Sequence, residues 1–329
     1  MVVEAPAEAV GPEPACGRRP PAGSASHRWR TALACVVPLL AVLWLLHSWS
    51  TVTASVRHLA AAHPGWLAVA VLAALPTWIA GAASLQGAVA RRLPVGPMLA
   101  VQVAGSVANH VLPAGFGVGA VKLRFLNRHG VPLREAVAAV GLDATAGMIT
   151  HVAVLVALLS GGFLHMSGPP GGLIATVAAV VAGLLAVGWA LPPIRRACRR
   201  GWTHVTAQAR MLAEILRVPS RAVMLWGGST AIPLLHAATL LFVVRALHLP
   251  LGAGAVFAIY YLASSASALI PSPGGFGSLD AALTAAIVAA GQSPTSALAA
   301  VLGYRLITVW IPLAPSACVM AALVRRGHL

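Results

Sequence analysis

Hydrophobic residues in this chain run in long stretches instead of alternating with polar residues. A helix that crosses the hydrocarbon core of a bilayer needs about 20 consecutive apolar residues. Six stretches reach that length, and we expect each to cross the membrane once. They cover residues 31–49, 65–90, 136–159, 171–190, 222–246 and 297–323.

Two further apolar stretches are shorter and end in breaks. Residues 97–112 run into "LPAGFGVG", and residues 254–270 run into "IPSPGGFGS". Proline cannot continue a helical hydrogen-bond ladder, and glycine permits unusual backbone angles. Non-helical backbone at membrane depth is tolerated only inside protein or beside a water-filled cavity. The breaks therefore predict an interior site rather than a lipid-facing surface.

The distribution of basic residues predicts the topology, because cytosolic loops carry an excess of lysine and arginine. Arginines precede the first predicted span, follow the second, fill segment 191–221 and end the chain, so both termini are expected in the cytosol. A full crossing by 97–112 would place four basic residues outside. These are Lys122, Arg124, Arg128 and Arg134.

A re-entrant hairpin at 97–112 keeps those four residues on the cytosolic side. By the same reasoning, 254–291 enters from outside and returns there. We therefore predict an all-α polytopic membrane protein with six full spans and two re-entrant broken helices. Eight full spans would also leave both termini in the cytosol, and the side of residues 113–134 distinguishes the two arrangements.

The two broken segments resemble each other. "LPAGFGVGAVKL" (112–123) aligns with "IPSPGGFGSLDAAL" (270–283), each with an apolar residue, a proline and then Gly-Phe-Gly. Under the predicted topology they enter from opposite faces, which is the pattern of an inverted repeat with broken helices.

Composition supports a membrane domain at 31–325 behind a disordered cytosolic tail at 1–30. The chain is 59% hydrophobic and 9% charged, whereas soluble domains carry about 25% charged residues. The net charge of +15 lies mostly between apolar segments, which favours an anionic membrane surface over nucleic acid as partner. No cysteine or histidine spacing predicts a metal, and we expect no cofactor.

Charges inside the membrane suggest the chemistry of the breaks. A central charge costs about 2.5–3.5 kcal/mol even on lenient scales, so Asp143, Asp280 and Arg305 argue for an enclosed polar cavity. We expect Ser278 to cap a short helix through about residue 290 whose N-terminus can hold a phosphate or carboxylate. The first break offers a similar site for a phosphate, because the short helix that follows it carries Lys122 and Arg124. Depths of about 12 Å for Arg305 and about 15 Å for Asp280 predict that these two side chains pair.

Three stretches resemble the lysylphosphatidylglycerol synthase transmembrane family. "NHVLPAGFGVGAVKLRFL" (109–126) is similar to its Asn-x-x-Leu-Pro segment, and "PSPGGFGSLDAAL" (271–283) to its Pro-x-Pro-Gly-Gly-x-Gly-x-x-Glu motif. "VLGYRLITVWIPL" (301–313) resembles its closing span. Asp280 stands where the family usually has glutamate, and Asp143 is followed by Ala144 where many members have an arginine.

The resemblance implies a flippase-like domain that moves aminoacylated phosphatidylglycerol or polyprenyl-linked lipids. It assigns substrate-binding positions to Asn109, Pro113, Gly117, Lys122, Pro273, Gly274, Gly275, Gly277, Asp280 and Arg305. The expected phosphate site at the first break adds Arg124. No soluble aminoacyl-transfer domain follows the spans, so aminoacyl-lipid synthesis is not expected.

The sequence favours a translocator of an anionic phospholipid or a lipid-linked headgroup. A transporter of a small anion and a non-transporting scaffold for lipid or glycan synthesis remain alternatives. An enzyme is not expected, because acid–base or metal chemistry needs clustered side chains. Outside the tail the acidic residues are Glu135, Asp143, Glu214 and Asp280, and no two share a short motif.

Overall fold

The computed structural model describes residues 49–111, 116–162, 217–268 and 277–325, and every element within these ranges is a helix. The chain divides into two compact units, residues 1–49 and 50–329. All of the helices below lie in the second unit, apart from Trp49, the first residue of α2 (Trp49–Ala60).

Four of the predicted membrane crossings are present as helices of sufficient length and apolarity. They comprise residues 64–88, 133–160, 219–246 and 294–323. In order, these are α3 (Pro64–Ala74) with α4 (Pro76–Ala88), α7 (Leu133–Ser160), α10 (Pro219–Ala246), and α13 (Pro294–Arg305) with η1 (Leu306–Trp310) and α14 (Ile311–Arg325). The predicted crossing at 31–49 falls outside the described residues except for Trp49, and the crossing at 171–190 falls outside them entirely, as do the tail at 1–30 and most of segment 191–221.

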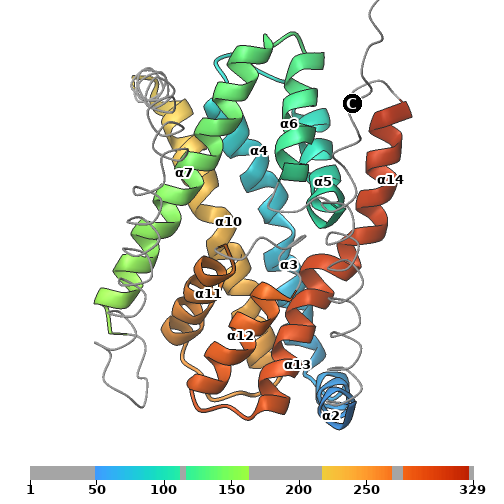
Figure 1. The fold of residues 1–329 in the computed structure, drawn as a ribbon, viewed down its shortest axis with the longest axis vertical. Coiled ribbons are helices and arrows are strands. Elements are labelled where there is room, and N and C mark those ends of the chain that lie inside the picture. The colour runs from blue at the N-terminus through green and yellow to red at the C-terminus, as the bar shows by residue number, and fades with distance from the viewer. Residues whose placement is uncertain (1–48, 112–115, 163–216, 269–276, 326–329) are drawn as a thin grey trace, which may run out of the picture. The chain divides into compact units, whose positions relative to one another are not determined.

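Each broken segment forms a hairpin of two short helices. In the first hairpin α5 (Val95–Val111) packs against α6 (Phe116–Arg128), and in the second α11 (Ala253–Ala268) packs against α12 (Ser278–Ala289). The first hairpin occupies the upper half of the helical unit in Figure 1 and the second the lower half. The inverted-repeat relationship between them stays a prediction.

Loop contacts show that the first hairpin returns to the end from which it starts. Arg91, just before α5, donates from Nη1 to the carbonyl of His129, just after α6, at 3.3 Å. At the other end, the amide of His63 donates to the carbonyl of Ala246 at 2.9 Å. The basic residues Arg91 and Arg128 therefore share one end, as a re-entrant hairpin requires.

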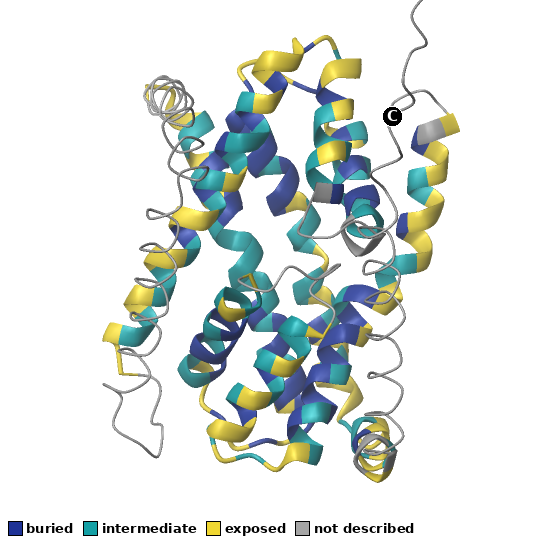
Figure 2. Ribbon diagram, viewed as in Figure 1, coloured by how far each residue is buried: buried dark blue, intermediate teal, exposed yellow. Residues whose placement is uncertain are grey.

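Two hydrophobic cores, each built around one hairpin, hold the helices together. Leu85, Val101 and Phe125 are among the buried residues around the first hairpin. Ile259, Leu283 and Val301 belong to the core around the second. Buried positions accordingly gather in both halves of Figure 2. Helix α10 contributes Leu225 to the first core and Val243 to the second, so it joins the two halves.

Helices α4 and α10 approach so closely that their backbones touch. A Cβ atom placed on Gly228 would lie 2.5 Å from the carbonyl oxygen of Ala80 and 2.6 Å from the amide nitrogen of Ser84. A Cβ atom on Gly87 would lie 2.4 Å from the amide nitrogen of Leu225. Only glycine fits at these two positions, because backbone atoms cannot swing aside as a side chain can.

Adding one methyl group therefore tests this contact. We expect Gly228→Ala to lower the free energy of unfolding by about 1–3 kcal/mol, the usual cost of overpacking. Gly227→Ala is the matched control, because nothing lies within 4 Å of its added Cβ. Thermal unfolding in detergent should show a lower midpoint for the first variant alone. Equal midpoints would contradict the close approach.

The shared end of Arg91 and Arg128 generates a labelling prediction. In a cysteine-free background, Arg128→Cys should resist an impermeant thiol reagent added to intact cells, because that end is predicted to be cytosolic. Gly252→Cys, in the exposed loop beyond α10, should react readily. Ready labelling at position 128 would contradict the cytosolic placement of the end that carries Arg91 and Arg128.

Candidate functional site

The carboxylate of Asp280 ties the second hairpin to the span that follows it. Asp280 lies in the first turn of α12, and its Oδ1 accepts from Nε of Arg305 at the end of α13. Its Oδ2 accepts from the backbone amide of Gly277 at 3.0 Å. The Arg305 side chain is 8% exposed and that of Asp280 is 29% exposed. The predicted pairing of these two side chains is confirmed.

The capping residue of α12 differs from the prediction. The helix begins at Ser278, and its N-cap is Gly277, with a φ of 80°. Glycine adopts that left-handed angle without strain. Since the carboxylate of Asp280 reaches back to the Gly277 amide, the helix is capped from its third position. The expectation that Ser278 is the cap was wrong by one residue.

A second buried ion pair stabilises the first hairpin. Nζ of Lys122 on α6 lies 2.7 Å from Oδ2 of Asp143 on α7, with side chains 12% and 10% exposed. The other oxygen of Asp143 accepts from Oγ of Ser84 on α4. That hydroxyl lies 2.8 Å from Oγ of Ser229 on α10. Four helices therefore meet around one carboxylate.

The sequence reasoning missed this pair. It assigned Lys122 to a lipid phosphate and gave Asp143 no partner, because the two residues lie in different predicted elements with no recognised motif between them. The available signal was electrostatic. An acid and a base placed inside the membrane, in the same half of the protein, each need a counter-charge.

The two ion pairs occupy equivalent places with their charges exchanged. In each case the partner on the hairpin lies on the helix after the break, and the other partner lies on the next span. At the first hairpin the base is on α6 and the acid on α7. At the second the acid is on α12 and the base on α13. Each pair therefore holds its hairpin against the following span.

Tyrosines and histidines form further polar contacts in the half of the protein that holds the second pair. The hydroxyl of Tyr304 lies 3.2 Å from Nδ1 of His236 on α10. Nε2 of His151 on α7 lies 3.1 Å from Oγ of Ser265 on α11, and its ring packs on Tyr261 at 4.5 Å. The buried hydroxyl of Tyr261 has no hydrogen-bond partner within the described part of the chain.

A π-helical segment follows Arg305 directly. In η1 the amide of Ile311 donates to the carbonyl of Leu306, five residues earlier. Such segments are rare and frequently mark functional sites. In this chain it lies within the last span, just beyond the buried arginine of that span.

The remaining predicted site residues are only partly placed. Gly117 is buried near the start of α6, while Arg124 is exposed on that helix and lies apart from the ion pairs. Asn109 lies in α5, with its side chain outside the description. Pro113, Pro273, Gly274 and Gly275 also lie outside the described residues. Among the residues that are described, no three histidine, cysteine or acidic side chains group as a metal site.

Comparison with protein families gives one finding. A family model described as "Lysylphosphatidylglycerol synthase TM region" matches residues 30–316. The match includes both hairpins and both ion pairs. Comparison with curated proteins gives no match.

The Lys122–Asp143 pair yields a stability prediction. Lys122→Met should lower the free energy of unfolding by about 3–5 kcal/mol, because it leaves a buried carboxylate without its counter-charge. Adding Asp143→Leu should recover much of that loss, since it removes the stranded charge. Thermal unfolding of both variants in detergent measures the difference. A double variant no more stable than the single one would contradict the pairing.

Proposed function

The chain belongs to the lysylphosphatidylglycerol synthase transmembrane family, and from this premise we propose that it is a membrane translocator for an anionic phospholipid or a lipid-linked headgroup. The observation that carries the proposal is the pair of broken hairpins, each held to the next span by one ion pair that is at least partly buried. Membrane lipids are its proposed partners, and no enzymatic step is proposed.

The ion pairs suggest how a phosphate could be handled. A phosphate oxygen and a carboxylate oxygen both accept charge-assisted hydrogen bonds from lysine or arginine. Lys122 and Arg305 could therefore exchange Asp143 or Asp280 for a lipid phosphate as the molecule passes. In that exchange the hairpin would be released from its neighbouring span, which would open one side of the site.

Each acid keeps a second hydrogen-bond donor during such an exchange. Asp143 retains the hydroxyl of Ser84, and Asp280 retains the amide of Gly277. Asp280 also lies at the positive end of the α12 dipole, which stabilises an anion. Since neither carboxylate would be left alone in the membrane, the exchange costs less than breaking an isolated pair.

The proposed orientation places both termini and the end that carries Arg91 and Arg128 in the cytosol, so that the first hairpin opens to the cytosol and the second to the outside. The membrane concerned is proposed to be the cell membrane. A basic cytosolic end would also concentrate anionic lipids at the first hairpin.

A transporter of a small anion is the second candidate, because the same breaks and bases suit any oxyanion. It differs in one measurable respect: its flux would not depend on lipid tails. A non-transporting scaffold differs from both, since changes at the ion pairs would alter partner assembly and leave lipid distribution unchanged.

Transport in proteoliposomes tests the proposal. We expect Asp280→Asn and Arg305→Gln each to slow exchange of a headgroup-labelled phosphatidylglycerol between leaflets by tenfold or more, about 1.4 kcal/mol of barrier. The charge swap Asp280→Arg with Arg305→Asp should restore folding but not transport, if Arg305 also binds phosphate. Arg245→Gln is the control, because Arg245 is exposed at the end of α10.

The outcomes separate the candidate functions. Normal lipid exchange in both single variants would contradict the translocator. If the same variants lost efflux of inorganic phosphate from the proteoliposomes without any change in lipid exchange, the small-anion transporter would be favoured. Leaflet-selective labelling of lipids in a deletion strain then identifies which lipid accumulates on which side.

A further inference from the structure

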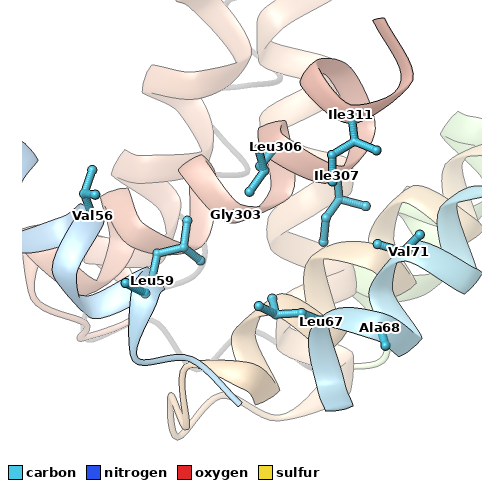
Figure 3. Close-up of a pocket in the computed structure, with 10 residues that line it drawn as sticks. Val56, Leu59, Leu67, Ala68, Val71, Gly303, Leu306, Ile307 and Ile311 are labelled. Atoms are coloured by element: carbon cyan, nitrogen blue, oxygen red, sulfur yellow. The ribbon is translucent and has the colours of Figure 1, made fainter. Parts of the chain in front are cut away.

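An apolar groove lies between α2, α3 and the π-helical part of the last span. Figure 3 shows side chains from all three walls around it, among them Leu59, Leu67 and Ile307. The groove has a volume of about 410 Å³, and every residue that lines it is apolar. Two of its walls, α3 and η1, belong to helices long and apolar enough to cross a membrane.

The groove continues into a second cavity that gains polar groups. This cavity of about 250 Å³ shares Val71, Ile307 and Ile311 with the first. Its lining adds the side chains of Thr77, Trp78, His236 and Thr308. The combined space is therefore apolar over most of its length and has a few polar groups at one end only.

Of these polar groups, His236 is the one whose second ring nitrogen, Nε2, has no hydrogen bond to another residue in the described part of the chain. Tyr304 occupies Nδ1 of His236 at 3.2 Å. When that nitrogen accepts the tyrosine proton, the neutral ring carries its own proton on Nε2. By contrast, the indole N–H of Trp78 lies 3.3 Å from Oγ of Ser106. The hydroxyls of Thr77 and Thr308 bond to helix carbonyls at 2.6 and 2.8 Å.

We propose that this groove binds one acyl chain of a glycerophospholipid, whose ester carbonyl oxygen accepts a hydrogen bond from Nε2 of His236. The inference rests on the proposed function and adds a binding site to it. Exposed apolar side chains flank the groove, including Leu72, Leu75 and Leu306. On membrane-spanning helices such a surface faces lipid tails, so a chain from the bilayer is the occupant already beside it.

The depth of His236 fits a lipid in transit. His236 lies ten residues before Ala246, where α10 ends, which corresponds to about 15 Å along the helix. In a resting bilayer, ester groups lie at the interface and not at that depth. A hydrogen-bond donor at that depth would therefore bind the ester group of a lipid only after its glycerol region has left the interface.

The site also touches the machinery of the second hairpin. Tyr304, which bonds to His236, precedes Arg305 in α13, and Arg305 pairs with Asp280 of α12. The tyrosine that bonds to His236 is thus the sequence neighbour of the arginine proposed to receive a lipid phosphate.

Photocrosslinking tests the groove without requiring transport. The wild-type protein is placed in nanodiscs with a phosphatidylglycerol that carries a diazirine in one acyl chain, and the labelled peptides are identified by mass spectrometry. We expect labels on α3 and η1. Ala68→Trp and Val71→Phe fill the groove and should each reduce this labelling about tenfold, equivalent to 1.4 kcal/mol. Ala153→Trp, at an exposed position on α7, should leave it unchanged.

An ether-linked phosphatidylglycerol tests the role of His236, because it lacks the ester carbonyl. In the wild-type protein it should compete about fivefold more weakly than the ester lipid, the effect of one ordinary hydrogen bond. In His236→Phe the two lipids should compete equally. Equal competition in the wild-type protein would overturn the assignment of His236.

The remaining outcomes separate this inference from the proposed function. Groove labelling that Ala68→Trp abolishes, in a protein that moves no lipid, would support the groove and contradict the translocator. Labelling that neither groove variant changes would overturn the groove, even if lipid transport is normal. A photoreactive residue at position 68 would also overturn the groove if it captured residues 31–48 of this chain instead of lipid. The same holds if an isoprenyl phosphate competed with the labelled lipid more strongly than phosphatidylglycerol does.

Discussion

A charge inside a bilayer must find its counter-charge within the protein, and in this chain that requirement ties each broken hairpin to the next span. The hairpins are short, so they cannot rely on length to hold their place in the membrane. Lys122 with Asp143 and Asp280 with Arg305 supply fixed points at which they meet longer helices. Another anion can compete with the carboxylate of an ion pair for the basic side chain. The same contacts therefore stabilise the hairpins and allow them to be released from the neighbouring spans.

The close packing of α4 and α10 supports the first of these pairs. Gly228 lets the α10 backbone lie against Ala80 and Ser84. That approach brings the hydroxyls of Ser84 and Ser229 within 2.8 Å of each other, and Ser84 in turn donates to Asp143. The glycine contact and the buried charge are therefore parts of one arrangement. Because α10 also packs against the second hairpin, it provides a common surface for both halves.

The two halves differ in what surrounds their ion pairs. Around Asp143 the neighbouring groups are small serine hydroxyls, which leave the helices tightly packed. Around Arg305 they are tyrosine and histidine side chains, and a π-helical segment follows. Larger side chains and a change in helical pitch leave space between helices, and the groove that ends at His236 lies there. The second half is thus the one built to admit a bulky apolar ligand from the side.

The sequence alone determined the helical class, the positions of four described crossings and the locations of both hairpins. Length, apolarity and proline–glycine breaks are local properties, and they do not depend on which helices meet. Depth along the helices was also enough to pair Asp280 with Arg305, since the two lie in consecutive elements. Only the tertiary structure decided that Lys122 meets Asp143, that Ser84 and Ser229 complete that contact, and that Gly277 rather than Ser278 caps α12. The same holds for the groove beside His236, whose walls come from α2, α3 and the last span. Such contacts depend on the rotation of each helix about its axis and on which helices are neighbours, and hydropathy carries no record of either.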